Sequence, residues 1–517
     1  SDGCSGARRR HYGSGAGRSS LATILDTMIG GNEMRPVFQL VDGDLAERII
    51  SEAKIVLTEI GIDVGDEETR ALLAEHGASA DGDDGRVRLA EGMVESALAT
   101  TPSSFSLHDI FGEETHRFDG RKTHFTPGSA AINILDRTSQ EIRPAVTRDL
   151  VNLAKVVSGL DGIDAQSTAL MSSDVPEEIS DSYRLYINLL HCEKPVVTGA
   201  FSIEGFFVIR DLLLAVRGSD EALAEKPLGI LTCCPTAPLR WTEEGAQNLL
   251  QCARHRIPAE IIPVPLTGFM APVTLVGTMI QHTAEVLSGV VIAQLVQPGT
   301  PLLFGGSPAI FDLRFETTPM GAVETAMLTC GAAQIGRHLG MPTQGYISLS
   351  DSKALDAQAG LETSMGATLA VLTGIDNVSG PGMLDFESCQ SLEKLVVDHE
   401  IIVMTKRLHA GVEPREDFPS KPLFEELLKE KHLLIADHTR RHLRDELTFP
   451  GPVIDRTARA RWLSEGAATL DQRAAAEVDR LIAEFSPSRL GEDKKQHLAE
   501  VMTAAAKAAG MNSLPEL

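Results

Sequence analysis

The feature that most constrains the fold is a repeated alternation between short runs of apolar or small residues and longer amphipathic stretches, which starts near His124. Short apolar runs are typical of buried strands, whereas apolar residues at three- and four-residue spacing are typical of helices. The expected strands span residues 123–128, 164–171, 195–201, 227–233, 258–266, 301–307, 342–348 and 376–382. The expected helices span residues 147–160, 177–192, 204–218, 242–255, 274–297, 319–339, 354–374 and 385–409. Eight strands that each precede a helix predict an α/β protein built on a (β/α)8 TIM barrel, with an open doubly wound sheet as the alternative.

The segments on either side of this repeat have a different composition. Residues 1–20 mix Gly, Ser and Arg without an apolar segment, which predicts a disordered tail rather than a signal peptide. Residues 21–122 are expected to form a helical N-terminal module with a small strand pair, and residues 123–410 the barrel. Residues 411–517 are expected to form a helical C-terminal extension that wraps the barrel or contacts another subunit.

Charge and cysteine content limit the compartment and the partners. Asp and Glu number 72 against 47 Lys and Arg, and the net charge of -25 disfavours nucleic acid and anionic membranes. The 7 cysteines are odd in number and form no CxxC pair, so neither a disulfide framework nor structural zinc is expected. No run approaches the roughly 18 to 20 uninterrupted apolar residues of a membrane span. We therefore expect a cytoplasmic protein, and we separately expect it to form a homo-oligomer.

Chemistry in such barrels sits at the carboxyl ends of the strands, where two segments are rich in polar and aromatic residues. The segment after the sixth strand joins Gly305–Gly306 to a loop from Phe311 to Glu316, which is either a functional loop or a lid whose Phe311 and Phe315 pack into the core. The segment after the seventh strand places Asp351 and Lys353 at the expected mouth. Lys353 is either a Schiff-base amine, or it pairs with Asp356 on a helix capped by Ser350, Asp351 or Ser352. No HExxH, P-loop or strand-anchored GxGxxG motif is present, so no metal site is expected and no catalytic residue is identified.

These two segments carry a family resemblance. Residues 299–360, together with GMLDFESCQSLEKLVVDHEIIVMTKR at 382–407 and the upstream stretch from 264, resemble the second half of the barrel in the trimethylamine methyltransferase family. The resemblance implies methyl transfer from an amine to the cobalt of a separate corrinoid protein, as in methanogenesis-type one-carbon metabolism. Founding members of the family carry pyrrolysine at the end of the seventh strand, where this chain has Gly345-Tyr346-Ile347-Ser348. The chain therefore resembles the members without pyrrolysine, which demethylate quaternary amines such as glycine betaine, proline betaine and carnitine.

The resemblance implies a methyltransferase that acts on a quaternary or tertiary amine, docks a Co(I) corrinoid (cobalamin-type) partner protein and binds no cofactor covalently. Aromatic faces and carboxylates hold a trimethylammonium group, and a substrate carboxylate needs a cation or a hydroxyl. The candidate substrate-binding residues are Phe269, Ser307, Phe311, Asp312, Arg314, Phe315, Tyr346, Ser348, Asp351 and Lys353. Two other interpretations stay open: a non-catalytic sensor of betaine-type solutes, and a Schiff-base or phosphate-handling enzyme that uses Lys353 with Gly305–Gly306 or Gly380–Gly382.

Overall fold

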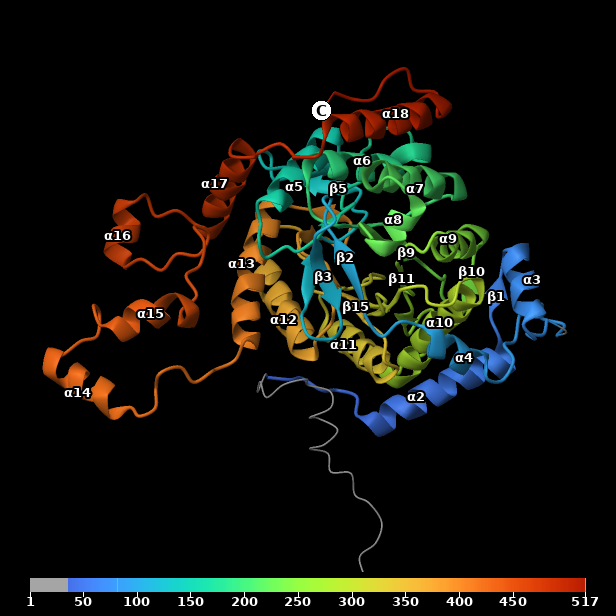
Figure 1. The fold of residues 1–517 in the computed structure, drawn as a ribbon, viewed down its shortest axis with the longest axis horizontal. Coiled ribbons are helices and arrows are strands. Elements are labelled where there is room, and N and C mark those ends of the chain that lie inside the picture. The colour runs from blue at the N-terminus through green and yellow to red at the C-terminus, as the bar shows by residue number, and fades with distance from the viewer. Residues whose placement is uncertain (1–35, 81, 517) are drawn as a thin grey trace, which may run out of the picture.

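The computed structural model describes residues 36–80 and 82–516, so the tail expected at residues 1–20 lies outside the described residues. Helices surround a central group of short parallel strands (Figure 1). The strands form two parallel sheets, of order β13-β11-β9-β8-β7 and β15-β16-β4. Their bounds are β4 (His124–Thr126), β7 (Gln166–Ser167), β8 (Val196–Thr198), β9 (Gly229–Cys233), β11 (Ala259–Ile261), β13 (Leu302–Phe304), β15 (Gln344–Tyr346) and β16 (Asn377–Ser379).

The α/β class with parallel strands is confirmed, but the ladder is not the single closed ring that the sequence predicts. The strands are so short that regular pairing stops between the two sheets. Isolated backbone hydrogen bonds remain at both junctions. At one, the Asp164 N–H donates to the Phe125 carbonyl at 2.8 Å, and at the other, the Phe304 N–H donates to the Pro342 carbonyl at 2.8 Å.

A helix follows each of these strands at the expected place, and side-chain caps define where several of the helices begin. Ser202, Thr242 and Thr274 each accept a hydrogen bond from the backbone N–H three residues ahead. Asp356, rather than Ser350, Asp351 or Ser352, caps the helix after β15, because the chain stays irregular up to that residue. The helices are α5 (Thr147–Ser158), α6 (Ser180–His191), α7 (Ile203–Arg217), α9 (Glu243–Arg254), α10 (Leu275–Val296), α11 (Val323–His338), α12 (Ala357–Thr373) and α13 (Leu392–His409).

Helix α10 corrects the expectation that no segment is long and apolar enough to span a membrane. It has 22 residues and meets that test by length and composition, although polar residues such as His282 and Glu285 interrupt its apolar run. In the structure, 72% of its most apolar window is buried. It packs against α9, α11 and two N-terminal helices, α2 (Gly43–Ile55) and α4 (Met93–Thr100). Its hydropathy therefore matches its place in the protein core.

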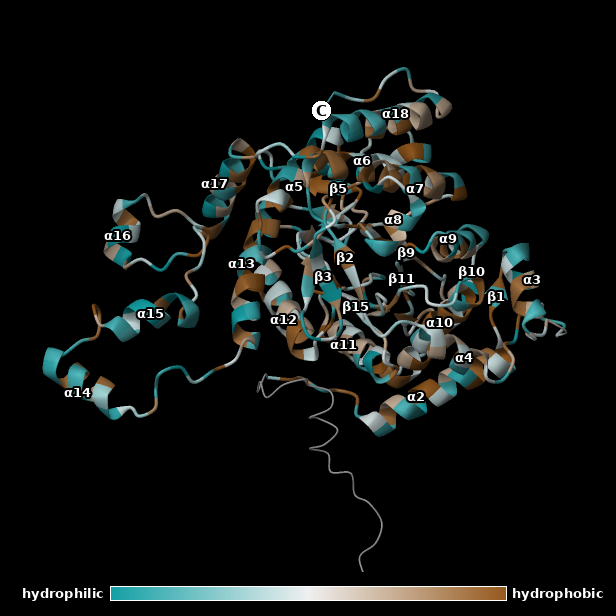
Figure 2. Cartoon of the chain, viewed as in Figure 1, coloured by the Kyte–Doolittle hydropathy of each residue, from teal (hydrophilic) through white to brown (hydrophobic). Residues whose placement is uncertain are grey.

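The flanking segments cover the outside of the sheets. On the N-terminal side lie η1 (Val56–Ile60), β1 (Asp63–Val64), α3 (Glu67–Glu75) and the antiparallel pair β2 (Phe105–His108) and β3 (Glu114–Phe118). On the C-terminal side, α17 (Leu470–Ala483) packs on α13, and α18 (Glu492–Ala508) packs on α7. Between them, α14 (Lys421–Glu430), α15 (Asp437–Glu446) and α16 (Arg459–Ser464) project away from the strands, and Figure 2 shows hydrophobic and hydrophilic turns mixed along them. None of the residues that form these three helices is buried.

Candidate active site

A cavity of about 560 Å³ lies at the carboxyl ends of the parallel strands. Both sheets contribute to its wall, because residues that end or follow β4, β7, β8, β9, β11, β13 and β15 all line it. Its strand-end hydroxyl groups come from Ser129, Thr168, Thr198, Thr232, Ser307 and Tyr346. This is the end of the strands where the sequence places the chemistry, and a volume of this size suits a small organic ligand.

Two of the predicted binding residues, Ser307 and Tyr346, line the cavity. The Tyr346 hydroxyl lies 2.7 Å from Ser129 Oγ, and burial raises the pKa of Tyr346 well above its usual value, so the phenol stays neutral. Ser348 comes two residues later with a left-handed φ of 69°, and its buried Oγ has no hydrogen-bond partner among the described residues. Ser348 is not part of the cavity wall.

The predicted residues Phe311, Asp312, Arg314 and Phe315, and Phe269 in the segment after β11, lie outside the cavity wall. Phe269 stacks on Phe311 with ring centroids 4.7 Å apart, and Phe315 is 72% exposed, so the expectation that Phe315 packs into the core is wrong. Arg314 pairs with Asp312 at 2.6 Å and lies over the Phe315 ring. The positive charge of Arg314 is therefore engaged within its own loop. These five residues come from two segments and form a partly exposed apolar and charged cluster instead of a binding wall.

Asp351 and Lys353 support the cavity from behind. Asp351 accepts hydrogen bonds from the Met320 N–H at 2.8 Å and the Gly321 N–H at 2.9 Å, and Met320 lines the cavity. Lys353 Nζ lies 3.6 Å from Asp385 and 3.8 Å from the centre of the Phe386 ring. The expected pairing of Lys353 with Asp356 is not formed, because Asp356 turns its carboxylate to the N–H groups that begin α12. Lys353 therefore fixes the loop that carries Phe386.

That loop supplies two wall residues that the sequence analysis missed, Phe386 and Glu387. It joins β17 (Met383–Leu384) to β18 (Cys389–Gln390), where the sequence predicts the first turn of a helix. Asp385, Phe386 and Glu387 have consecutive positive φ values of 49°, 55° and 67°. Such backbone strain in residues other than glycine persists only where the surrounding structure imposes it. The strained backbone therefore aims the Phe386 and Glu387 side chains at the cavity.

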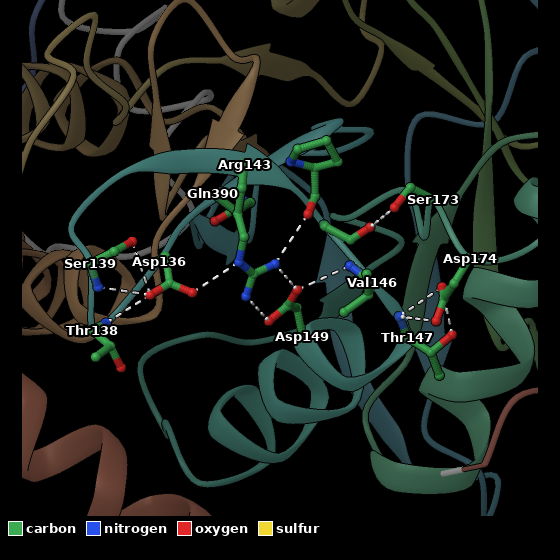
Figure 3. Close-up of polar contacts among 12 residues, drawn as sticks. Asp136, Thr138, Ser139, Arg143, Val146, Thr147, Asp149, Ser173, Asp174 and Gln390 are labelled. Atoms are coloured by element: carbon green, nitrogen blue, oxygen red, sulfur yellow. Dashed lines mark hydrogen bonds and ion pairs between the residues drawn. The ribbon is translucent and has the colours of Figure 1, made fainter.

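A network around Arg143 anchors the sheet behind this loop (Figure 3). Strand β18 pairs with β5 (Asn133–Leu135), which pairs with β6 (Ile142–Pro144). Arg143 of β6 donates to Asp136 at 2.9 Å and to the two carboxylate oxygens of Asp149 at 2.7 and 3.0 Å. Asp149 lies in the first turn of α5, so the sheet that carries Glu387 is tied to a helix of the central fold.

Two carboxylates give this region an unusual charge state. The Oε1 atom of Glu387 is buried without a hydrogen-bond partner in the described chain, and burial, with the nearby Asp351 charge, raises the pKa of Glu387 to about 8. Glu260 in β11 is fully buried and accepts a 2.7 Å hydrogen bond from the Thr232 hydroxyl, which lines the cavity. Burial raises the pKa of Glu260 to about 7. A cationic ligand would favour the ionised form of both groups.

The opposite charge comes from Arg184 of α6, another wall residue that the sequence analysis missed. Arg184 lies within a helix and not at a strand end, so the position rule for such barrels does not select it. Its Nη1 donates to the Thr168 carbonyl at 2.8 Å, and its guanidinium lies 4.7 Å from the centre of the Phe201 ring. Burial lowers the pKa of Arg184 to about 10, so it remains cationic at neutral pH.

The wall holds few groups suited to covalent or metal chemistry. Among the described residues that line it there is no lysine. Of its two cysteines, Cys234 is exposed, whereas Cys233 is buried, and the neighbouring Cys252 thiol together with burial raises the pKa of Cys233 well above its usual value, which keeps it a weakly nucleophilic thiol. The glycines proposed to cradle phosphate are closely packed instead. A Cβ on Gly306 would overlap His282, and one on Gly382 would overlap Gln390. The arrangement favours binding and positioning of an organic ion.

Comparisons with known proteins give consistent matches along the chain. The family profile described as "Trimethylamine methyltransferase (MTTB)" matches residues 8–510. The trimethylamine methyltransferase MttB of Desulfitobacterium hafniense is 26% identical over 437 residues, or 84% of this chain and 88% of that protein. The glycine betaine methyltransferase of D. hafniense strain Y51 is 28% identical over 460 residues, or 89% and 95% of the two chains. A monomethylamine methyltransferase structure (MtmB) from Methanosarcina barkeri has a TM-score of 0.48 and 10% identity, and covers 87% of this chain and 89% of its own. The family match includes both parallel sheets and every wall of the cavity.

Proposed function

The chain belongs to the trimethylamine methyltransferase family, as the resemblance predicts, and we propose that it moves a methyl group from a quaternary or tertiary amine, such as a betaine, to the Co(I) corrinoid of a partner protein. The observation that carries this proposal is the cavity wall, which holds aromatic rings together with the carboxylate of Glu387, whose Oε1 atom is buried without a hydrogen-bond partner in the described chain. A fully methylated ammonium group has no N–H to donate, so aromatic faces and a carboxylate are the groups that stabilise it.

The residues of the wall act by binding and orientation. Glu387 supplies the counter-charge, and Tyr346 and Phe386 supply ring faces, each worth about 0.5 to 2 kcal/mol for a desolvated cation. A corrinoid on the partner would supply a Co(I) nucleophile for the methyl carbon, and the electron pair of the broken N–C bond would stay on nitrogen. A quaternary nitrogen leaves as a neutral amine, so no proton has to move. The largest contribution of the protein is then to hold the methyl carbon in line in a dry site.

Exposed apolar residues lie near the rim of the cavity. Val264 is both a wall residue and 39% exposed, and Phe269 lies five residues further along the same chain segment. Phe269, Leu313 and Phe315 are 62%, 73% and 72% exposed. Exposed apolar residues gathered near a binding site are typical of a docking surface. We propose that the corrinoid protein docks over these loops.

We also propose that the two parallel sheets close into one eight-stranded (β/α)8 barrel. The hydrogen bonds from Asp164 to Phe125 and from Phe304 to Pro342 support closure, because each links the edge strands of the two sheets in parallel order. We also propose the division into domains that the sequence predicts: an N-terminal module at 21–122, the barrel at 123–410 and a C-terminal extension at 411–517. The cytoplasmic location, the homo-oligomer and the absence of nucleic-acid and membrane partners also stay predictions.

The reaction class is tested by a screen of quaternary and tertiary amines with the purified protein and free Co(I)alamin. We expect at least one quaternary amine to cause a time-dependent loss of the Co(I) absorbance and the appearance of methylated cobalamin. The sensor interpretation predicts tight amine binding with no loss of absorbance. The Schiff-base interpretation predicts borohydride trapping on Lys353, which lies outside the cavity wall.

Tyr346 offers a test of the aromatic wall. The Tyr346→Leu variant is expected to raise the Kd for tetramethylammonium by about 30-fold, because a desolvated cation–π contact contributes about 2 kcal/mol. Tyr346→Phe is the matched control. It loses the hydroxyl that meets Ser129 but keeps the ring, so its Kd should stay within about threefold of the wild-type value. Calorimetric titration of the three proteins measures both effects, and equal weakening by both variants would rule out the ring face as the binding group.

The two carboxylates predict a pH dependence for cation binding. Glu387 lines the cavity, and Glu260 lies behind the wall residue Thr232. Below the raised pKa values of about 7 for Glu260 and about 8 for Glu387, each group is neutral and attracts a cation weakly. The affinity for tetramethylammonium should therefore rise by at least about tenfold from pH 6 to pH 9, because binding must release the carboxyl protons at the lower pH. Titrations at several pH values measure it, and Glu387→Gln should leave only the smaller dependence due to Glu260.

A further inference from the structure

We propose that residues 411–450, which form an arm outside the central fold, pack on helix α12 of a second copy of this chain, and that the arm of the second copy packs on α12 of the first. The protein is then a symmetric pair of interlocked subunits. This inference concerns the outer surface of the molecule and does not depend on the reaction proposed for the cavity.

The first support is that the arm holds two helices with nothing packed on their apolar sides. Helices α14 and α15 have 10 residues each, and none of those residues is buried. Helices this short are marginal in water unless tertiary packing covers an apolar face. Apolar side chains one helical turn apart are exposed on both, namely Phe424 and Leu428 on α14, and Leu443 and Leu447 at the end of α15. The arm therefore carries apolar ridges that need a partner.

Polar contacts hold the arm in place where it meets α13. Arg407 near the end of α13 lies 3.6 Å from Glu446 of the arm. Directly after the arm, the Gly451 N–H donates to Glu400 of α13 at 3.0 Å. Figure 1 shows α14 and α15 projecting away from the helices around the strands. The arm is thus fixed to the body at its base, while its apolar ridges face outward.

The second support is an apolar groove of about 750 Å³ on the outer side of α12. Only residues of α12 line it, and none of them is charged. Gly360, Ser364 and Thr368 follow one another at four-residue spacing, and beside them Leu361 and Met365 are 72% and 38% exposed. In a chain with 23% charged residues, an outer helix face without charge is typical of an interface. Such a groove suits the apolar ridge of another helix.

The charges of the two surfaces favour this chain as the occupant. Residues 439–444 of α15 include three arginines and no carboxylate. By contrast, Glu362 is the one charged residue of α12, and the chain as a whole has a net charge of -25. A basic helix is attracted to an acidic surface. One copy of the chain therefore supplies both an arm and a surface that is complementary to the arm of another copy.

The places of the arm and the groove fit a reciprocal contact. Helix α13, from which the arm departs, packs directly on α12, so a two-fold axis beside α13 brings each arm to the α12 of the other copy. Lys406 near the end of α13 pairs with Asp164, just before β7, so the arm begins at the end of the strands opposite the cavity mouth. A partner over the mouth does not cover that region. Two such arms are large enough for the about 20 to 30 residues on each side of a stable interface.

Sedimentation velocity of the purified protein, without amine or cobalt compound, is expected to give a mass of two chains or a multiple of two. Leu361→Glu in the groove and Leu428→Lys on the arm should each raise the dissociation constant of the pair by at least about 30-fold, because each places a charge among apolar side chains. The matched control is Ile60→Lys, since Ile60 is 49% exposed and lies outside both surfaces. It should leave the pair intact.

Mixing the two variants tests the exchange itself. A mixed pair keeps one native contact between arm and groove, and its other contact joins the two introduced charges of opposite sign, so an equal mixture should regain the mass of the wild type. Far-UV circular dichroism equal to that of the wild type excludes unfolding as the cause of any loss. Variants that pair as tightly as the wild type, or a folded mixture that stays monomeric, would overturn the proposal.

The remaining outcomes concern other occupants. A monomeric wild type whose binding to a corrinoid protein is weakened by both substitutions would assign the arm and the groove to that partner instead. Deletion of residues 1–35 should leave the pair intact, and loss of the pair would assign the groove to that segment. Pairing without methyl transfer to Co(I)alamin would overturn only the proposed reaction.

Discussion

The Glu387→Gln variant is expected to lower kcat/KM for methyl transfer from a quaternary amine by about 100-fold, because removing one partner of a desolvated charge contact costs about 2 to 5 kcal/mol. Glutamine keeps the shape of the side chain and removes only the charge that faces the cavity. Steady-state kinetics with free Co(I)alamin measure the change, and calorimetry measures the matching loss of affinity for tetramethylammonium.

The matched control for this variant is Glu285→Gln. Glu285 is also a buried carboxylate whose pKa burial raises to about 7, but it lies on α10 outside the cavity wall and accepts from the Leu239 N–H. This control should leave kcat/KM within about threefold of wild type. A similar loss in both variants would mean that general destabilisation, and not the charge at residue 387, causes the effect.

Thermal unfolding gives a second reading of Glu387. Its pKa in the folded protein, about 8, lies above the ordinary value of 4.5, so the folded state binds more protons than the unfolded state between these pH values. The contribution of Glu387 to stability is therefore lost as pH rises from about 4.5 to about 8. The Glu387→Gln variant should show a smaller fall in Tm over this range, which also shows that the variant is folded.

The Lys394→Met variant is expected to lower the free energy of unfolding by about 3 to 5 kcal/mol, because it leaves a buried carboxylate without its counter-charge. Lys394 Nζ lies 2.5 Å from Asp398, and their side chains are 0% and 1% exposed. Asp398 also accepts from the Gly382 N–H at 2.7 Å, just before the strand that leads to the Asp385–Glu387 loop. The variant should therefore weaken amine binding as well as stability.

Denaturant unfolding of Lys394→Met and of Lys421→Met measures this effect. Lys421 is the matched control, since its side chain is 81% exposed and pairs with Glu425 across one helical turn. Its loss should change the free energy of unfolding by less than about 0.5 kcal/mol. A Lys394 variant as stable as the Lys421 variant would show that the buried pair does not hold the loop after β16.

Much of the fold could be predicted because its signals are local. Helices such as α5 and α9 leave a periodic pattern within their own residues, and the parallel strands fall in short runs of apolar or small residues bounded by turn residues. The division into two sheets could not be predicted. It depends on which neighbouring strands are too short to form a regular ladder of hydrogen bonds, and those strands are distant in the sequence. The apolar character of helix α10 was also not recognised from the sequence, because buried polar residues interrupt its apolar run.

The candidate site was predictable only where it follows the strands directly. Ser307 and Tyr346 end or follow a strand and line the cavity, and their role as binding residues stays a prediction. Glu387 reaches the cavity through the pairing of β18 with β5, strands more than two hundred and fifty residues apart, which leaves no local pattern. Arg184 reaches the cavity through the packing of α6. A single arginine in a helix is normally interpreted as a surface residue.

The central claim is that this cavity positions an N-methylated cation for transfer of one methyl group to cobalt. The most direct measurement uses a quaternary amine with ¹³C in its methyl groups, free Co(I)alamin and the wild-type protein, and quantifies both products by mass spectrometry. We expect equal amounts of labelled methylcobalamin and demethylated amine, and about 100-fold slower formation with Glu387→Gln. Labelled methylcobalamin formed at the same rate by the two proteins, or no label on cobalt with any amine that binds in the cavity, would contradict the claim.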